Sequence, residues 1–492
     1  MSASVFDAPD DPNQWYLSSA HEIALTTINS SQQEEALLSY FGRINYSYDD
    51  RYLLQVNARF DGSSRFTAEN RWGFFPAFSA GWNIAEESFM QNVPQVNTLK
   101  LCGSWGWVGN QNSVSNYNFV VTVDPSMLYV LNNEIVQGFI PTRLANPDLV
   151  WETTTSTNIG IDAGFFQDRR LFTADYFVKT TTDMIVDGQL PRFAGAYPAR
   201  INAGSMQNNG LELSLIYRNQ VGEFAYDLSA NATLITNEVV DLADVPFYAG
   251  GSVGRIGNTT RTEVGYEIAY FYGLESDGLF NNQEEVDSYV GSDGTRIQPQ
   301  AKPGDIKFVD QNADGVIDDE DRIYLGSGTP AFSYGFSAGA SFKGFDLRIF
   351  LQGTFGNEIV NGMWGAFHEP LGFNNATRDR LDRWTPTNTE TNEPRMFITS
   401  ADNLRFSDYY VEDGSYLRVR NVTLGYTLPA ALLPANARIR VYAASDNLLT
   451  FTKYSGWDPE IGELYYNPFW YGVDQATYPQ PRRFRAGIDV KF

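Results

Sequence analysis

Apolar and polar residues alternate in pairs of neighbouring segments, and this alternation constrains the fold of the chain more than any other feature. Successive side chains of a β-strand point to opposite faces of the sheet. In residues 37–48 the apolar positions of one face are Leu38, Tyr40, Ile44, Tyr46 and Tyr48. The same period returns in residues 52–60 after only three intervening residues. The two segments therefore predict a β-hairpin with one apolar and one polar face.

Further hairpins of the same kind recur along the chain, and their connections are of two very unequal lengths. We expect paired strands at 159–165 and 172–178, at 211–217 and 224–232, at 332–342 and 345–351, and at 415–428 and 437–450. The stretches between the pairs are long and cover residues 109–149, 185–204, 238–330, 357–414 and 451–479. Short turns at one end and long loops at the other are typical of transmembrane β-barrels. The sequence thus predicts an all-β, antiparallel membrane barrel wall of about thirteen strands, counted from residue 35.

The alternation of apolar and polar residues changes phase within residues 416–428. The apolar positions are Leu417 and Val419 before the change and Val422 and Leu424 after it. One extra residue in a strand produces such a slip. We expect a β-bulge near residue 420.

Two soluble alternatives remain open at this stage. The strands of a soluble β-sandwich or β-propeller also alternate apolar and polar residues, although propellers space their strands evenly. The main alternative is a secreted or surface calcium-binding, β-rich glycan hydrolase or adhesin. The discriminating observation is the apolar face of each strand, because a soluble protein buries it under a second layer whereas a membrane barrel leaves it uncovered.

Charge and residue counts exclude several classes of function. The chain has 59 acidic and 35 basic residues, a net charge of −24, which argues against nucleic acid as a partner. With two histidines and one cysteine among 492 residues, a histidine-based triad or a Cys/His metal site is disfavoured. Carboxylates are abundant, yet no pair is singled out as a glycosidase pair. We therefore expect no enzymatic activity.

The sharpest local motif is "DQNADGVIDDED", residues 310–321. Its spacing matches a calcium loop with Gly315 at the sharp turn. The candidate ligands are Asp310, Asn312, Asp314, the carbonyl of Val316, Asp318 and Asp321. The last position holds Asp where such loops usually hold Glu, which shortens the reach of that ligand. The alternative is an exposed turn rich in Asp, Asn and Gly that binds no ion. Apart from this possible Ca²⁺ we expect no cofactor.

Several aromatic residues stand at predicted strand ends or in the long loops. As candidates for stacking on a ligand we name Trp105, Trp107, Trp364, Trp457, Trp470 and Tyr471. Packing between loops is the favoured explanation for each of them when taken alone.

Seven stretches, in order along the chain, resemble the SusC/RagA-like TonB-dependent outer-membrane transporters. They are "YFGRINYSYDDRYLLQVNARFDGSSRF", "RWGFFPAFSAGWNIAEESFM", "LKLCGSWGWVGNQ", "PGDIKFVDQNADGVIDDEDRIYLGSGTP", "YLRVRNVTLGYTLP", "SDNLLTFTKYSGWDPE" and "YPQPRRFRAGIDVKF". One departure is Cys102, where the family usually has Arg.

The resemblance implies a fold, a location and partners. It implies an outer-membrane location in a Bacteroidetes-type Gram-negative cell, and a barrel of roughly 22 strands with a plug. It also implies energy supplied through the TonB complex, a SusD-like lipoprotein as lid, and import of oligosaccharides or oligopeptides. On this basis residues 1–34 are expected to be a remnant of an earlier strand or loop, and residues 35–492 the C-terminal portion of the barrel. The signal peptide, plug and early strands are expected to be missing, so we expect no transport by this chain alone. The final aromatic, Phe492, resembles the signal read by the outer-membrane assembly machinery.

Overall fold

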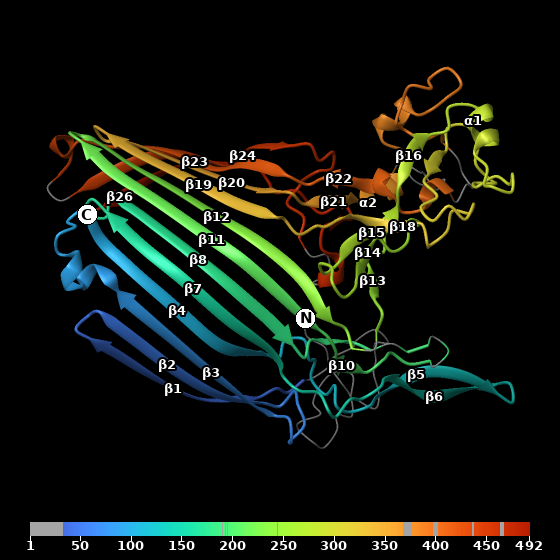
Figure 1. Cartoon of the computed structure of the whole chain (residues 1–492), viewed down its shortest axis with the longest axis horizontal. Coiled ribbons are helices and arrows are strands. Elements are labelled where there is room, and N and C mark those ends of the chain that lie inside the picture. Colours follow the sequence, from blue (N-terminus) through green and yellow to red (C-terminus); the bar gives the residue numbers. More distant parts are fainter. Residues whose placement is uncertain are drawn as a thin grey trace.

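A single antiparallel sheet of thirteen strands dominates the computed structural model (Figure 1). The structure describes residues 33–492 except 189, 192, 194, 244, 368–375, 397–401, 435–436 and 463–466, so nearly all of the predicted remnant 1–34 lies outside the described residues. In spatial and chain order the strands are β1 (Leu37–Tyr48), β2 (Tyr52–Ser63), β3 (Trp72–Asn83), β4 (Val96–Asn110), β7 (Glu152–Phe165), β8 (Arg170–Thr182), β11 (Ser205–Val221), β12 (Phe224–Asp241), β19 (Phe332–Phe342), β20 (Phe345–Phe355), β23 (Tyr416–Thr427), β24 (Arg438–Thr452) and β26 (Arg483–Lys491). The predicted strand number and hairpins are confirmed.

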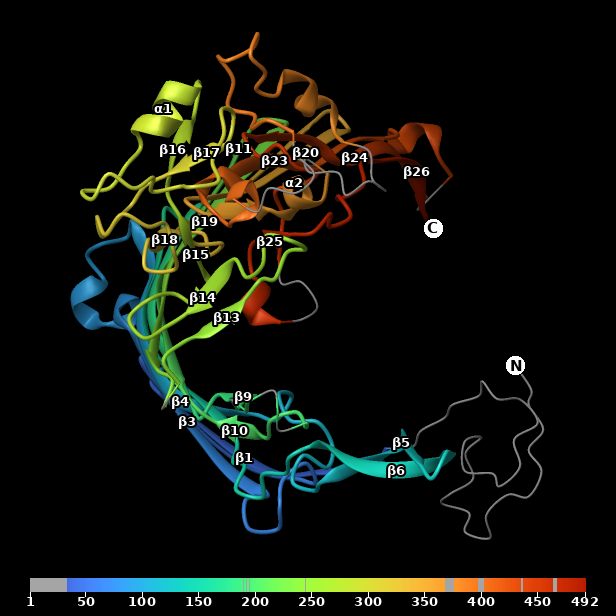
Figure 2. The same cartoon turned by 90° about the vertical axis from the view of Figure 1, so that its right-hand side faces the viewer.

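The sheet is strongly curved and forms an open trough, as the view along the strands shows (Figure 2). Strands β1 and β26 are its outermost members, and in the described part of the chain each pairs with one neighbour only. Among these residues, no helix is both long and apolar enough to cross a membrane.

Tight turns join the strands at one end of the trough. Between β1 and β2, Asp49 and Asp50 have φ of 55° and 53°, and between β19 and β20, Lys343 and Gly344 have φ of 48° and 88°. Two successive positive φ values give the turn whose twist matches that of the flanking strands. Asp and Gly tolerate this conformation better than most residues, so these short sequences fix the register of their hairpins.

The convex face of the trough carries an unbroken row of apolar or small side chains. Partners across a sheet point to the same face, so the row can be followed through the strand register. From β1 to β20 successive partners are Tyr46, Leu54, Ala80, Gly103, Ile159, Tyr176, Leu211, Leu234, Phe332 and Phe355. A second row continues through the last strands with Leu347, Leu424, Ala443 and Ala486. Among the described residues no second layer covers this face: Ile44, Leu215 and Ile488 are 69%, 52% and 67% exposed.

Aromatic side chains gather at both ends of this convex face. At the short-turn end, Tyr48 stacks on Tyr52 with ring centroids 6.5 Å apart, and Phe345 lies 4.6 Å from Tyr426. At the other end, Phe60 stacks on Trp72 at 4.9 Å. Interfacial aromatic girdles of this kind flank the apolar band of membrane barrels.

The spacing of the girdles fits a bilayer. Phe332 and Phe342 mark the two ends of β19 and lie ten residues apart. At about 3.3 Å per residue the separation is roughly 33 Å along the strand, and a strand tilt of about 40° reduces it to roughly 25 Å, the height of the apolar band in such barrels.

The predicted bulge in β23 is present. The register shifts between Val419 and Asn421 against β24, and between Phe350 and Leu351 against β20. Arg420 is the extra residue, and the bulge restores the apolar phase of the strand on the convex face.

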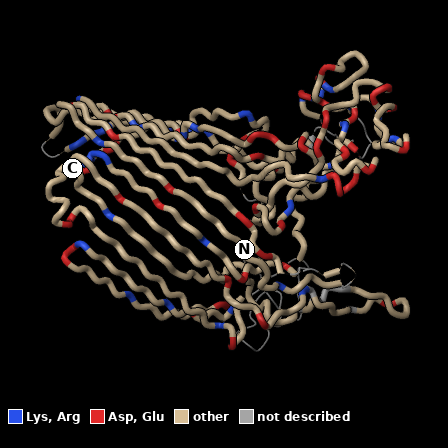
Figure 3. Tube along the Cα trace, viewed as in Figure 1, with Lys and Arg blue, Asp and Glu red and all other residues tan. Residues whose placement is uncertain are grey.

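The long connections lie at the opposite end from the tight turns and contain small elements of their own (Figure 1). They comprise β5 (Thr122–Leu131), β6 (Glu134–Arg143), β9 (Ile185–Asp187), β10 (Arg200–Asn202), β13 (Tyr248–Gly250), β14 (Thr260–Thr262), β15 (Tyr270–Leu274), β16 (Ser276–Leu279), α1 (Gln283–Ser288), β17 (Ile306–Phe308), β18 (Arg322–Gly326), β21 (Glu358–Asn361), α2 (Gly362–Phe367), β22 (Val411–Asp413) and β25 (Val473–Asp474). Short 3-10 turns within these connections lie at Arg378–Asp382, Asp402–Leu404, Asp408–Tyr410 and Pro468–Trp470, whereas those at Ile84–Glu86, Ser88–Met90 and Ala430–Leu432 lie in connections at the tight-turn end. Charged residues are sparse along the middle of the strands and dense in these connections (Figure 3).

A core of buried side chains joins connections that are far apart in the sequence. Phe271, Val360, Phe406, Tyr410 and Val473 are members of one cluster. The long connections therefore pack on one another and form a defined mouth at one end of the trough.

Candidate functional site

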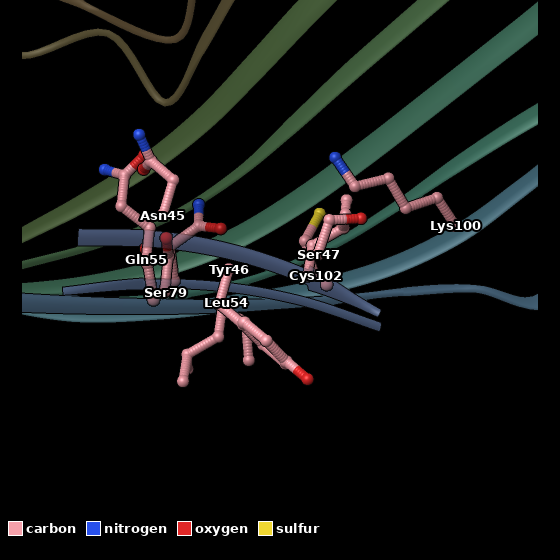
Figure 4. A pocket seen from close by; sticks show the side chains of 14 residues that line it. Asn45, Tyr46, Ser47, Leu54, Gln55, Ser79, Lys100 and Cys102 are labelled. Atoms are coloured by element: carbon pink, nitrogen blue, oxygen red, sulfur yellow. The ribbon is translucent and has the colours of Figure 1, made fainter. Parts of the chain in front are cut away.

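The concave face of the trough is polar where the convex face is apolar. Asn45, Gln55, Ser79, Ser104 and Asn158 follow one another across five strands. Figure 4 shows Asn45, Gln55 and Ser79 on the side of the sheet opposite to Tyr46 and Leu54. A hollow of about 520 Å³ lies against this row, and Lys100 is the only charged residue in its lining as far as the described residues show. Along this row the inner wall thus offers mainly neutral hydrogen-bonding groups to whatever occupies the trough.

A larger cavity of about 900 Å³ lies at the mouth, and we call it the mouth cavity. It is built by connections that are distant in sequence but converge at the long-loop end. Its wall includes Asn112, Ser113, Ser115, Glu152, residues 184–188, Arg200, Tyr248, Ile268 and residues 467–469. Cavities of this size with a few converging polar groups are common ligand sites.

Charges of both signs are fixed in the wall of the mouth cavity. Asp187 accepts from Arg143 at 2.6 Å and lies 3.4 Å from Arg200. Arg143 also donates to the carbonyl of Pro198 at 2.8 Å. Oε2 of Glu152 accepts from the backbone N–H of Ile185 at 3.3 Å. The arginines and carboxylates hold each other in place, so the cavity has ordered donors and acceptors and no strong preference for one sign of charge.

An aromatic pair forms another side of the mouth cavity. The rings of Tyr248 and Phe469 are parallel within 17°, with centroids 5.4 Å apart. Gly250 makes this contact possible, because a Cβ there would stand 2.6 Å from the carbonyl oxygen of Phe469. Thr260 then fixes the segment by donating to that same oxygen at 2.6 Å.

The hydroxyl of Tyr248 is buried and has no hydrogen-bond partner among the described residues. Burial, and then the charge of Asp187, raises the pKa of Tyr248. The side chain therefore stays neutral at physiological pH. The cavity wall combines an apolar ring surface with neutral and paired polar groups, which suits binding.

The aromatic residues predicted from the sequence do not form one site. Trp105 stacks on Phe78 at 5.9 Å and lies 5.6 Å from Trp107, on the convex face. Their placement does not support a ligand contact inside the mouth. Trp364 packs on Tyr409 at 5.1 Å beside the buried core of the connections.

The remaining predicted aromatics lie in the connection between β24 and β26. Trp457 is 57% exposed. Trp470 and Tyr471 directly follow Phe469, so they are the predicted candidates closest along the chain to the mouth cavity. The prediction did not include Asp187, Arg200, Tyr248 or Phe469.

The predicted calcium loop is folded around its own backbone. Its carboxylates accept from backbone N–H groups: Asp310 from Gly315 at 2.9 Å, Asp314 from Val316 at 2.9 Å, Asp318 from Glu320 at 2.7 Å, and Asp321 from both Gln311 and Asp318 at 2.8 Å. Asn312 accepts from Asp314 at 3.0 Å. Gly315 has a φ of 88°, which is the conformation that its place in the motif requires.

Two features of this loop fit a cation. Oδ1 of Asp310 is buried without a hydrogen-bond partner, and Asp321 is fully buried although it carries a carboxylate. Within the described residues, no three His, Cys, Asp or Glu side chains converge closely enough to hold a metal ion by themselves. A calcium ion here would therefore also need the side chain of Asn312 and the carbonyl of Val316, both of which are oxygen ligands that Ca²⁺ accepts.

Comparison with known proteins places this geometry among outer-membrane receptors. Residues 3–448 match the family model described as TonB dependent receptor-like, beta-barrel. The chain is 32% identical over 474 residues to TonB-dependent receptor P3 of Formosa agariphila, covering 94% of the chain and 46% of that relative. It is 30% identical over 500 residues to TonB-dependent receptor SusC of Bacteroides thetaiotaomicron, covering 97% of the chain and 46% of SusC.

A solved structure agrees in fold. The chain superimposes on a chain of the RagAB peptide transporter with a TM-score of 0.75 and 28% sequence identity, covering 97% of this chain and 50% of that chain. The chain thus spans about half the length of the relatives that it matches.

Proposed function

The chain belongs to the TonB-dependent receptor β-barrel family, and from this membership we propose that it forms the wall and mouth of an active importer of oligosaccharides or oligopeptides. It is an outer-membrane barrel protein, similar to receptors and transporters. Import needs a polar interior, a membrane-facing exterior and a specific entrance, and the described residues offer a candidate for each.

The observation that carries the proposal is the two-faced sheet. Its convex face presents apolar side chains across thirteen strands with aromatic girdles, while its concave face presents polar rows. A secreted hydrolase or adhesin would bury the apolar face under a second layer, since an exposed apolar area of this extent is unstable in water. The soluble alternative is therefore not favoured.

In this proposal the mouth cavity contacts the imported molecule before it enters the barrel. The Tyr248–Phe469 pair supplies an apolar surface, and Asp187, Arg200 and Glu152 supply acceptors and donors at its rim. Both oligosaccharides and peptides present apolar surface together with donors and acceptors, so the cavity suits either class.

Two partners follow from the family. A SusD-like lipoprotein would cover the mouth, and the TonB complex would supply energy to the whole receptor. Support for the lipoprotein comes from the likeness to SusC and to the RagAB transporter. The connections that form the mouth offer the surface on which such a lid would dock.

We assign the loop 310–321 a bracing role with Ca²⁺ as its ion. Asp310, Asp314, Asp318 and Asp321 would supply carboxylate oxygens, Asn312 its side-chain oxygen and Val316 its carbonyl. The buried, unpartnered oxygen of Asp310 supports this proposal. The ion would fix an external connection and take no part in chemistry.

Uptake in the host tests the importer proposal. Fluorescently labelled oligosaccharide and peptide pools are offered to wild-type cells, to cells lacking this gene and to cells lacking TonB. Uptake of at least one pool that falls in both deletion strains supports the proposal. Equal uptake of every pool in all three strains would contradict it.

A further inference from the structure

A small sheet above the mouth has one face built almost wholly of tyrosine and arginine. Strands β13, β14, β15 and β18 form this four-stranded sheet, which lies at the long-loop end of the trough (Figure 1). Phe271 of β15 points to one face and is fully buried in the core with Val360 and Val473. Neighbouring residues of a strand point to opposite faces, so Tyr270 and Tyr272 belong to the other face.

Four tyrosines on or beside this other face form a continuous aromatic surface, which we call the tyrosine platform: Tyr266, Tyr270, Tyr272 and Tyr324. Tyr270 stacks on Tyr266 at 4.8 Å and on Tyr324 at 5.4 Å, and Tyr272 meets Tyr270 edge-on at 6.1 Å. Tyr270 is 2% exposed and forms the floor, whereas Tyr266 and Tyr324 are each 43% exposed. The solvent-facing side of a small sheet is ordinarily covered by polar residues, so two half-exposed rings stacked within about 30° on a buried third ring are an unusual outer surface.

Charged groups of both signs surround the rings. Arg261 lies over the ring of Tyr272 at 4.5 Å and pairs with Glu263 at 2.6 Å. The hydroxyl of Tyr270 donates to Glu263 at 3.1 Å. On the far side Arg322 pairs with Asp319 at 3.0 Å. The rings and charges enclose a hollow of about 390 Å³.

The hydroxyls of Tyr270 and Tyr324 remain protonated at physiological pH. Burial, followed by the charges of Glu267 and Glu358, raises the pKa of Tyr324 to about 12. Burial and Glu263 raise the pKa of Tyr270 further. Tyr270 and Tyr324 therefore present neutral rings over the physiological range of pH, beside the ion pairs made by Arg261 and Arg322.

We propose that the tyrosine platform is an external binding site for an oligosaccharide, one or two sugar units of which lie on the rings of Tyr266 and Tyr324. This site is distinct from the mouth cavity, and its role in uptake rests on the proposed importer function. A pyranose ring has an apolar C–H face that packs on an aromatic ring, and its hydroxyls both donate and accept hydrogen bonds. The paired charges match those hydroxyls: the carboxylates accept and the guanidinium groups donate.

The same features argue against other ligands. An anionic ligand would need an excess of positive charge, whereas each arginine here already faces a carboxylate. A peptide side chain would need a closed apolar socket, whereas Tyr266 and Tyr324 are each 43% exposed.

Affinity electrophoresis of the protein purified in detergent from host outer membranes tests the proposal. Native gels contain starch, laminarin, xylan, mannan or a tryptic peptide pool as the probe. The test variant carries Tyr266→Ala and Tyr324→Ala together, and a second carries Tyr→Phe at both positions, which keeps the rings. The matched control is Tyr478→Ala, because Tyr478 is 83% exposed and lies outside the platform.

We expect at least one polysaccharide to retard the wild type, the Phe variant and the control. The Ala variant should lose at least about tenfold in affinity, equivalent to one stacking contact of about 1.4 kcal/mol. Unchanged retardation of the Ala variant, retardation by the peptide pool alone, or no retardation by any polysaccharide would each overturn the proposal. The importer proposal is contradicted by a different result, namely uptake that does not depend on TonB. The Ala variant could also fail to copurify with the lipoprotein while polysaccharide still retards it in the gel. That result would show that the platform is a protein interface and would refute the sugar site.

Discussion

Replacement of Arg418 by alanine is expected to release the connection between β24 and β26 from the barrel wall. The side chain of Arg418 is 2% exposed and pairs with Asp458 at 2.5 Å and with Glu460 at 2.6 Å. It also donates to the hydroxyl of Thr450 at 3.0 Å. One buried guanidinium on β23 thus holds a connection some forty residues further along the chain, the one that contains the Phe469 side of the mouth cavity.

The expected cost follows from the geometry. Two unit charges about 4 Å apart attract by about 4 kcal/mol at the effective dielectric of a protein. The ion pair with Glu460 contributes less to stability, because the side chain of Glu460 is 30% exposed. Asp458 keeps two backbone N–H donors, from Glu460 at 2.9 Å and Gln480 at 2.8 Å, so it is not left without partners. We expect a loss of about 3 kcal/mol, at the low end for removing one partner of a buried pair.

Hydrogen exchange of the protein in detergent measures this local loss. About 3 kcal/mol corresponds to roughly hundredfold faster exchange in residues 453–462 and 467–480. The control is Arg485→Ala, because Arg485 pairs with Asp446 at 2.9 Å but is 58% exposed. The control should change exchange by less than about fivefold. Equal exchange in the two variants would refute the reasoning.

Three further outcomes are expected. Asp321→Asn should abolish the protection from protease that Ca²⁺ gives the connection 238–330, while chelation should remove it from the wild type; identical digestion with and without Ca²⁺ in the wild type would contradict the calcium proposal. Burial raises the pKa of Glu358, so the folded protein holds that proton more tightly than the unfolded chain does. The resulting stability is present below the ordinary carboxyl range and is lost as the pH rises through the raised pKa. Glu358→Gln should therefore flatten the fall of the melting temperature as the pH rises above the ordinary carboxyl range, and an unchanged slope would contradict this prediction. Deletion of Phe492, which is 99% exposed after β26, should lower the amount of assembled barrel in outer-membrane fractions, and unchanged levels would show that the residue is no assembly signal.

The barrel strands were predictable because their determinants are local. Period-two alternation, as in residues 37–48 and 52–60, fixes which face is apolar, and the tight turns fix the pairing. Even the bulge at Arg420 was visible as a slip of the apolar phase. The face of Trp105 could also have been predicted, because it is in phase with Leu101 on the same strand.

The mouth could not be predicted in the same way. Strands such as β9, β10, β13 and β14 have three residues each, too few to show a period. Tyr248 and Phe469 are more than two hundred residues apart, so nothing local predicts that their rings stack. The tyrosine platform was missed for the same reason, although its alternation through Tyr270 and Tyr272 was present in the sequence.

The central claim is that the convex face meets lipid and the concave face lines the interior of the barrel. Leu215 on the convex face and Ser214 next to it on the concave face provide a matched pair on β11. Leu215→Arg should lower the free energy of unfolding in lipid vesicles by about 2–4 kcal/mol, the cost of arginine near the middle of the bilayer. Ser214→Arg should lower it by less than about 1 kcal/mol. A cost at Ser214 that equals or exceeds the cost at Leu215 would contradict the account.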